Sequence, residues 1–124
     1  MTAFRAAVLE HFRHPRNRGP LENANAIAEG ANPLCGDRIR VELRIERDAI
    51  REARFTADAC ALCIASASVM TTQVTGMGAS DAAVLEVRAI HDALEGEPPR
   101  GRLKCAALPL DTLKRALSAR MSTP

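Results

Sequence analysis

A cysteine at a sharp corner precedes the best strand pattern of the chain. Cys35 lies between Pro33 and Gly36, two residues that disfavour the interior of both helices and strands. Residues 38–46 then alternate apolar and polar side chains, which predicts a β-strand. The sequence therefore predicts an exposed thiol on a tight turn. Asp37, two residues after the cysteine, can add a carboxylate oxygen to whatever that thiol binds.

The other elements follow from hydrophobic periodicity and turn residues. Residues 50–56 predict a second strand in a hairpin with 38–46, and residues 26–29 predict a short third strand. Helices are predicted over 3–13, 61–74, about Ser80 to His91, a single turn at 103–107, and 109–120 with Pro109 at its start. This order predicts the α+β fold class: a small antiparallel three-stranded sheet with helices packed on one face.

Composition limits the size and the partners of the protein. The 124 residues suffice for one domain, 1–124, with a core of its own, and the lack of Trp and Tyr makes that core aliphatic. A net charge of +2, with few aromatic rings to stack on bases, argues against nucleic-acid binding. No apolar stretch reaches the length of a membrane span, and the N-terminus lacks a signal-peptide core. We therefore expect a cytoplasmic protein with no membrane role.

Three cysteines that are far apart in the sequence are expected to converge. Cys35 precedes the first hairpin strand and Cys60 follows the second, and these two ends meet in an antiparallel hairpin. Cys60 and Cys105 both lie near predicted helix N-termini, where free N–H groups favour a thiolate. With Asp37, these residues form a donor set that suits Zn²⁺, and the three sulfurs equally suit an iron–sulfur cluster. Without an export signal, metal or redox ligands are favoured over two disulfides.

Other interpretations remain open at this point. Cys60 and Cys63 form a CxxC at a predicted helix start, which is typical of thiol–disulfide oxidoreductases, although no βαβ unit surrounds it and Cys63 is better suited to packing. His11, His14 and His91 could be further ligands, and a structural role at the end of a helix is favoured for the first two. A purely structural zinc site and cysteines that only fill the core are the remaining alternatives.

Four ordered motifs that span nearly the whole chain resemble the U-type iron–sulfur cluster scaffold proteins, the IscU/NifU N-terminal/SufU family. The motifs are His11-Phe12 through Gly19, Asn32-Pro33-x-Cys35-Gly36-Asp37, Cys60 with Ile64 to Ser68, and Arg102-x-Lys104-Cys105. The resemblance implies a SufE/NifU-like scaffold without enzymatic turnover. It would accept sulfur from a cysteine desulfurase of the SufS or IscS type, bind iron or zinc, and pass a transient [2Fe–2S] cluster to apo iron–sulfur proteins.

The resemblance also implies residue roles. Cys35, Asp37, Cys60 and Cys105 would hold the metal or cluster, and Cys35 and Cys105 are the candidate persulfide acceptors. Asp37 would keep the metal exchangeable, because a carboxylate is a harder and more weakly held ligand than a thiolate. We expect a monomer.

Two departures from the Isc-type pattern indicate which branch of the family the chain resembles. Lys104 stands where Isc-type members have His, and Glu97 to Gly101 replaces their chaperone-recognition peptide Leu-Pro-Pro-Val-Lys. Lys104 and residues 66–71 are similar to the SufU branch, although the usual SufU insertion before the last cysteine is absent. The sequence is therefore interpreted as a compact SufU-like scaffold. The alternative is a zinc-bound sulfurtransferase that activates a SufS-type desulfurase.

Overall fold

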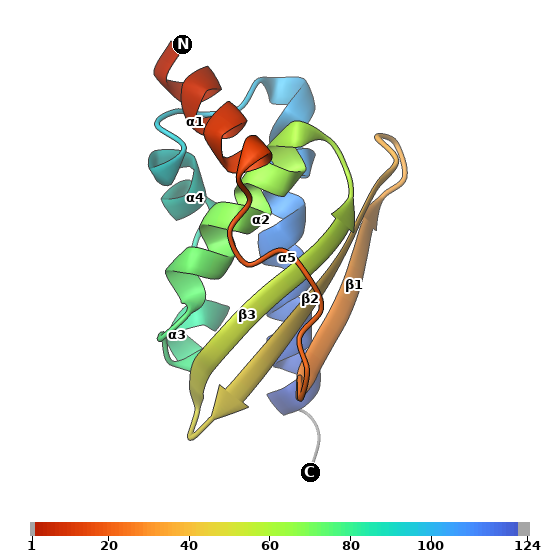
Figure 1. Cartoon of the computed structure of the whole chain (residues 1–124), viewed down its shortest axis with the longest axis vertical. Helices are drawn as coiled ribbons and strands as arrows, with labels where there is room; N and C mark the ends of the chain where they lie inside the picture. The colour runs from red at the N-terminus through yellow and green to blue at the C-terminus, as the bar shows by residue number, and fades with distance from the viewer. Residues whose placement is uncertain (1, 122–124) are drawn as a thin grey trace.

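The computed structural model describes residues 2–121 and contains one three-stranded sheet covered by helices (Figure 1). Strands β1 (Ala26–Asn32), β2 (Asp37–Glu46) and β3 (Ala49–Asp58) pair antiparallel in the order β1-β2-β3. The helices are α1 (Thr2–Arg13), α2 (Ala61–Val74), α3 (Ala79–Ala83), α4 (Val87–Ala93) and α5 (Leu103–Met121), with a 3₁₀ turn η1 (Arg100–Arg102). The predicted α+β class is confirmed. Strands β1 and β3 are longer than predicted and reach Asn32 and Asp58.

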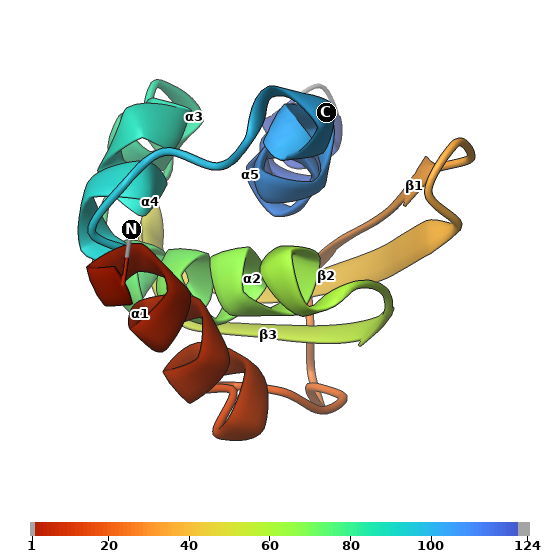
Figure 2. The same ribbon diagram turned by 90° about the horizontal axis from the view of Figure 1, so that it is seen from above.

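The core lies between the sheet and two helices. Alternate positions of β2, from Ile39 to Ile45, point to one face and are buried, and Phe55 of β3 is fully buried opposite Val41. Helices α2 and α5 lie on that face, and α1 packs on the far side of α2 (Figure 2). The core is thus aliphatic, as the composition predicts.

Helix α2 is buried on almost every side. Its side chains are short, and Ala65, Ser66, Ala67 and Ser68 are all fully buried. Short side chains let α1, α5 and β3 approach the same helix closely. This central position fixes the N-terminus of α2, and therefore Cys60 just before it, relative to the sheet.

Two tight turns connect the strands. Arg47 and Asp48 form a two-residue turn between β2 and β3, and both have positive φ angles, 52° and 62°. Residues 33–36 connect β1 to β2; Cys35 N–H donates to Asn32 O at 3.1 Å, and Gly36 has a φ of 73°. The predicted exposed corner is therefore the tip of the β1–β2 hairpin.

The prediction of a single helix from Ser80 to His91 is wrong. The segment forms two short helices, α3 and α4, and α3 begins after Gly78 without a side-chain cap. Val84 N–H bonds back by three residues to Asp81 O, which tightens the last turn of α3 and ends it. The break leaves Val84 74% exposed, while Ala82 and Ile90 on either side are both fully buried.

The prediction of two helical pieces separated at Pro109 is also wrong. Helix α5 runs unbroken from Leu103 to Met121 with Pro109 inside it. Proline has no N–H to donate to the carbonyl of Cys105, one turn earlier, and an interior proline costs about 3 kcal/mol or more. Burial of Leu110, Leu113 and Leu117 against the sheet and α2 offsets this cost. Tertiary packing therefore outweighs the helix-breaking effect of Pro109.

The N-terminal segment is attached to α2 and to the edge of the sheet. Helix α1 ends before His14-Pro15, as predicted. Ser68 Oγ accepts Arg16 N–H at 2.8 Å and lies 2.8 Å from His11 Nδ1. Gly19 N–H then donates to Phe55 O at 2.8 Å, so the segment covers the edge of β3. No helix among residues 2–121 is long and apolar enough to cross a membrane.

Candidate metal and sulfur site

Asp37 is a carboxylate at a core-facing position. It is the first residue of β2 and lies on the same face as Ile39 and Val41, which leaves it 1% exposed. Its Oδ1 accepts the N–H of Cys60 at 2.9 Å. Its Oδ2 is buried and has no partner among the described residues. A buried carboxylate oxygen without a donor is costly in the protein alone and suits a cation.

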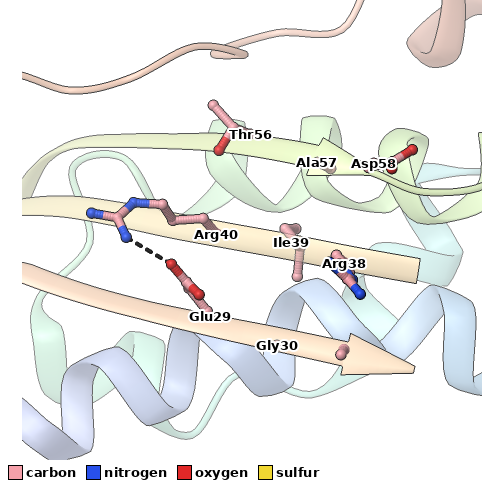
Figure 3. Close-up of a pocket in the computed structure, with 9 residues that line it drawn as sticks. Glu29, Gly30, Arg38, Ile39, Arg40, Thr56, Ala57 and Asp58 are labelled. Atoms are coloured by element: carbon pink, nitrogen blue, oxygen red, sulfur yellow. Dashed lines mark hydrogen bonds and ion pairs between the residues drawn. The ribbon is translucent and has the colours of Figure 1, made fainter. Parts of the chain in front are cut away.

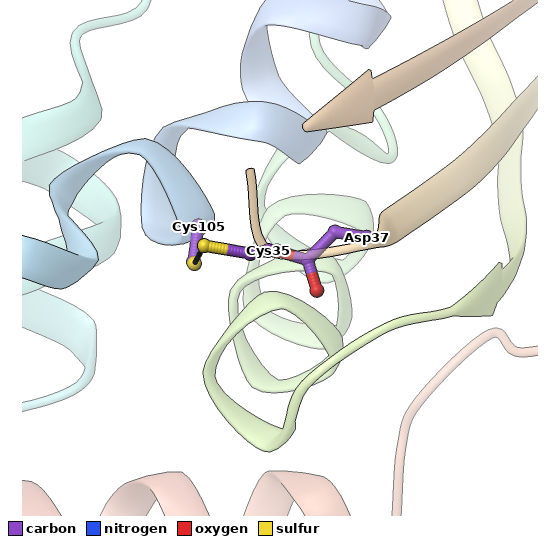
Figure 4. Close-up of side chains that lie close together, drawn as sticks. All are labelled: Cys35, Asp37 and Cys105. Carbon is purple, nitrogen blue, oxygen red and sulfur yellow. Dashed lines mark hydrogen bonds between the residues drawn. The ribbon is translucent and has the colours of Figure 1, made fainter. Parts of the chain in front are cut away.

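Two cysteines reach the same point from distant parts of the chain. Cys35 lies at the exposed tip of the β1–β2 loop, and Cys105 lies in the first turn of α5 with 0% exposure (Figure 4). The Cys105 thiol donates to Cys35 Sγ with a sulfur–sulfur distance of 3.6 Å. One donor atom from each of Cys35, Asp37 and Cys105 lies within 4.8 Å of the other two. The structure therefore brings together three of the four predicted ligands.

Cys60 is adjacent, but its sulfur does not belong to that group of mutually close donor atoms in the described part of the chain. It occupies the N-cap position of α2, is half-buried, and donates its backbone N–H to Asp37. The register pairs Arg38 with Asp58, so the start of β2 and the end of β3 meet as the sequence predicts. Cys60 therefore adjoins the site through its backbone, while its sulfur lies outside the group.

Two exposed cations, Arg102 and Lys104, precede Cys105 in the chain. The charge of Cys60 raises the pKa of the Arg102 guanidinium, and Cys105 acts in the same direction. Burial raises the pKa of the Cys105 thiol well above its usual value, and the neighbouring side chains of Asp37 and Cys35 add to this effect.

The CxxC pair does not form a redox site in this structure. Cys63 is 0% exposed, and burial raises the pKa of its thiol to about 12, with the charges of Asp37 and Cys60 adding to the effect. Cys63 belongs to the core cluster, and its sulfur lies outside the group of Cys35, Asp37 and Cys105, so it is assigned to packing. The expectation that Cys63 packs in the core agrees with this position.

The three histidines do not join the cluster of Cys35, Asp37 and Cys105. His11 contacts Ser68 on α2, as described above, and His14 is exposed next to Pro15. His91 lies in α4, where its Nε2 is buried without a partner among the described residues. Their structural role is consistent with these positions.

Sequence reasoning missed one residue at the site. Asn32 ends β1 on the core-facing side, pairs with Asp37 across the sheet, and is 8% exposed. Its Nδ2 points to Cys105 Sγ at 4.0 Å. In the sequence, Asn32 stands out only as part of a motif. The signal for its role is its period-two alignment with Ala28 and Gly30, which places it on the inner face.

The donor set fits a thiophilic metal. Two thiols and one carboxylate are ligands of zinc and of iron. The 3.6 Å between the Cys35 and Cys105 sulfurs is close to the about 3.8 Å that separates two thiolates on a tetrahedral zinc with Zn–S bonds of about 2.3 Å. The unpartnered Oδ2 of Asp37 agrees with this fit. Metal binding is therefore supported by the residues themselves.

An open hollow lies on the face of the sheet that is turned away from α2 and α5 (Figure 3). It has a volume of about 720 Å³, and its charged lining residues are Glu29, Arg38, Arg40 and Asp58. Arg40 is paired with Glu29 at 2.8 Å and with Glu42 at 3.6 Å. The pairing of these charges is typical of a solvated sheet face, and we assign no ligand to it.

Comparisons with known proteins agree on one family. The family model described as NifU-like N terminal domain matches residues 3–122. The iron–sulfur cluster assembly scaffold protein IscU of Aquifex aeolicus is 38% identical over 112 residues, which cover 89% of this chain and 71% of that protein. The zinc-dependent sulfurtransferase SufU of Bacillus subtilis is 37% identical over 75 residues, which cover 60% of this chain and 50% of SufU.

A solved structure has the same fold. The N-terminal part of a nitrogen-fixing NifU-like protein from Brucella abortus superimposes with a TM-score of 0.75, covering 95% of this chain and 94% of that chain at 24% sequence identity. At this identity the likeness concerns the fold alone. The family model and the IscU relative carry the assignment: the chain belongs to the NifU-like N-terminal domain family.

Proposed function

We propose that the chain is a single-domain scaffold for iron–sulfur cluster assembly. It accepts sulfur from a cysteine desulfurase, binds iron, assembles a [2Fe–2S] cluster and passes the cluster to apo iron–sulfur proteins. The single observation that carries this proposal is the convergence of Cys35, Asp37 and Cys105 within 4.8 Å, with one oxygen of Asp37 left without a protein partner. The names of the relatives, IscU and NifU scaffolds, support it.

The ligands of the cargo are Cys35, Asp37, Cys105 and Cys60. Cys60 joins the other three by rotation of its side chain, since its backbone N–H is already bonded to Asp37. Arg102 balances the charge of the thiolates. Zinc occupies the same four ligands when iron and sulfide are absent, because the donor set suits both metals.

A second candidate is a zinc-bound sulfurtransferase partner of a desulfurase. It is favoured by the exposure of Cys35 at a loop tip, where the persulfide of another protein can reach it, and by the likeness to SufU. In this candidate the metal fixes the site, and no cluster is assembled.

Anaerobic reconstitution distinguishes the two candidates. The chain is incubated with ferrous iron, cysteine and a SufS-type desulfurase, and bound iron, acid-labile sulfide and visible absorption are measured. We expect iron and sulfide in equal amounts with charge-transfer bands. Cys35→Ala and Cys105→Ala abolish retention of both, whereas Cys63→Ala, which removes a buried thiol outside the cluster, retains them.

One bound zinc per chain, faster desulfurase turnover and no cluster would favour the sulfurtransferase over the scaffold. Equal retention of iron and sulfide by the Cys35→Ala and Cys63→Ala variants would contradict both candidates, because the cluster would then lie elsewhere.

A further inference from the structure

We propose that Cys105 is a resolving cysteine: it attacks a persulfide carried by Cys35, releases hydrogen sulfide and leaves a Cys35–Cys105 disulfide in the metal-free chain. This inference rests on the proposed function, because the sulfane sulfur has to be delivered to the site. It adds a reaction to that function, namely reduction of the delivered sulfur by a thiol of the scaffold itself.

The difference in exposure between the two cysteines assigns their roles. Cys35 is exposed between Leu34, which is 87% exposed, and Gly36, so another molecule can reach its sulfur. Cys105 is 0% exposed and lies behind it. Sulfur therefore arrives at Cys35, and only Cys35 stands between Cys105 and the incoming donor.

The two sulfurs are already at contact distance. They lie 3.6 Å apart, close to the separation of about 3–3.5 Å at which reacting atoms are positioned for attack. A disulfide requires about 2.05 Å. The remaining approach involves the hairpin tip, where Gly36 has a positive φ and its surroundings are open: a Cβ at this position would meet no atom within 4 Å.

Asn32 fixes the less mobile partner. Its Nδ2 lies 4.0 Å from Cys105 Sγ, and its backbone carbonyl accepts the N–H of Cys35 at 3.1 Å. One residue thus contacts both cysteines and holds the loop tip over the first turn of α5. This arrangement keeps the Cys105 sulfur 3.6 Å from Sγ of Cys35, the atom that would be the inner sulfur of a persulfide.

The reaction balances without another reactant. The sulfur of Cys105 forms a bond to Sγ of Cys35 while the bond between that Sγ and the outer sulfur breaks. The outer sulfur is reduced and leaves as H₂S with the proton of the persulfide and the proton of the Cys105 thiol, and the two cysteines are oxidised together to the disulfide. A dithiol reductant returns the pair to thiols before the next cycle.

The other cysteines do not replace this pair. The Cys63 sulfur lies outside the group of mutually close donor atoms formed by Cys35, Asp37 and Cys105 among the described residues. The Cys60 sulfur does not belong to the group of mutually close donor atoms that the structure describes. The reaction is therefore specific to Cys35 and Cys105.

The test uses the full chain, reduced, freed of metal with a chelator and kept anaerobic without added thiol. One equivalent of an alkyl hydropersulfide is added, and three quantities are measured: free sulfide, the mass of the intact protein, and the disulfide pairing in an alkylated peptide map. A sample without protein corrects for decay of the persulfide. We expect one sulfide per chain and a Cys35–Cys105 linked peptide.

Variants distinguish the acceptance of sulfur by Cys35 from the later attack by Cys105. In Cys105→Ser the added sulfur stays on Cys35 as a persistent mass increase, and sulfide release slows by about tenfold or more. Cys63→Ala behaves like the wild type. The wild-type peptide map decides the proposal even if the serine variant does not fold.

Two negative results have different meanings. In the first, the wild-type chain keeps a persulfide on Cys35 while Cys105 remains open to alkylation. This result would contradict the resolving role of Cys105 but not the acceptance of sulfur by Cys35. A chain that takes up no sulfur on any cysteine, in the wild type or in either variant, overturns the sulfur-acceptor part of the proposed function as well.

Discussion

Asp37 shows how the fold prepares a site from a single residue. The alternation of β2 would place an apolar side chain at this position, in line with Ile39 and Val41, yet the sequence places a carboxylate there. One oxygen is bonded to the N–H of Cys60 at the start of α2, and the other has no protein partner. Under the proposed function, a metal ligated by this oxygen would offset the cost of burying it.

Substitution of Asp37 by Ala should make a reconstituted cluster longer-lived. A carboxylate oxygen is a harder and more labile ligand for iron than a thiolate, so the variant loses the labile ligand and keeps the three thiolates, which bind iron more firmly. The half-life of the visible absorption bands under chelator challenge measures this effect. Asp37→Asn serves as the size-matched control for loss of the charge alone. A cluster that decays faster in Asp37→Ala than in the wild type would count against the assigned role.

For individual residues, the sequence predicted the convergence of Cys35, Asp37 and Cys105, three of the four candidate ligands. The motif around Cys35 indicated the exposed corner, and hairpin pairing predicted that the starts and ends of the strands meet. The position of the Cys60 sulfur outside the group was not predictable, because it depends on how α2 docks against the sheet. The turn η1 just before Cys105 was not predictable either, because the sequence contained no periodic signal for it.

Gly30 is the point of closest approach between β1 and α5. A Cβ built there would overlap Thr112 Oγ1 and would lie 3.2 Å from Leu108 Cδ1. The strand and the helix can pack this closely only because residue 30 lacks a side chain. Since α5 carries Cys105, this contact also fixes the distance between Cys105 and the sheet.

Gly30→Ala should lower the free energy of unfolding by about 1–3 kcal/mol, the range seen when a well-packed core is overfilled. Gly101→Ala is the matched control, because a Cβ at that position would meet no atom within 4 Å. Urea unfolding followed by circular dichroism measures both variants. Equal stability of the two variants would mean that β1 and α5 are not packed as described.

The contact between α1 and α2 should be sensitive to pH. Burial and the Arg16 guanidinium lower the pKa of His11, although Glu10 acts in the opposite direction. The folded state then binds protons more weakly than the unfolded state, so this residue's contribution is present above the unfolded pKa of about 6.5 and is lost as the pH falls towards the lower folded value.

The wild type should therefore lose more stability than His11→Gln between about pH 7.5 and pH 5.5. Urea midpoints at the two pH values measure this difference, in which groups common to both proteins cancel. Identical losses in the two proteins would show that His11 is not held neutral against Ser68.

Element boundaries illustrate what local patterns cannot predict. The alternation of β2 and the small-residue pattern of α2 were sufficient to place both elements. The break between α3 and α4 has no proline or glycine to signal it; it follows from the need to bury Ala82 and Ile90 together. The continuity of α5 through Pro109 depends on leucine burial that is visible only in the folded chain.

The hydrophobic core of the molecule extends far beyond the site, although Cys105 belongs to it and Cys60 packs against it. The core runs from Ile39 of β2 to Leu117 of α5, whereas the cysteine cluster lies at one end of the sheet. A domain of this size with such a core does not depend on a metal to fold. The α+β class could be predicted from the order of elements, but the packing of α5 over β1 could not.

Removal of metal by a chelator should leave a cooperatively folded protein. The melting temperature should fall, because a ligand bound only to the folded state stabilises it by mass action, but the far-ultraviolet circular dichroism should be unchanged. Thermal melts with and without chelator measure this. Loss of the circular dichroism signal on chelation would instead indicate a structural zinc domain.

The central claim is that Cys35, Asp37, Cys60 and Cys105 together hold one metal. X-ray absorption at the zinc edge of the chain loaded with one equivalent of zinc tests it most directly. The account predicts three sulfur neighbours at about 2.3 Å and one oxygen at about 2.0–2.2 Å. A first shell with two sulfurs or fewer would contradict the account, because it would leave at least one of the three cysteines off the metal.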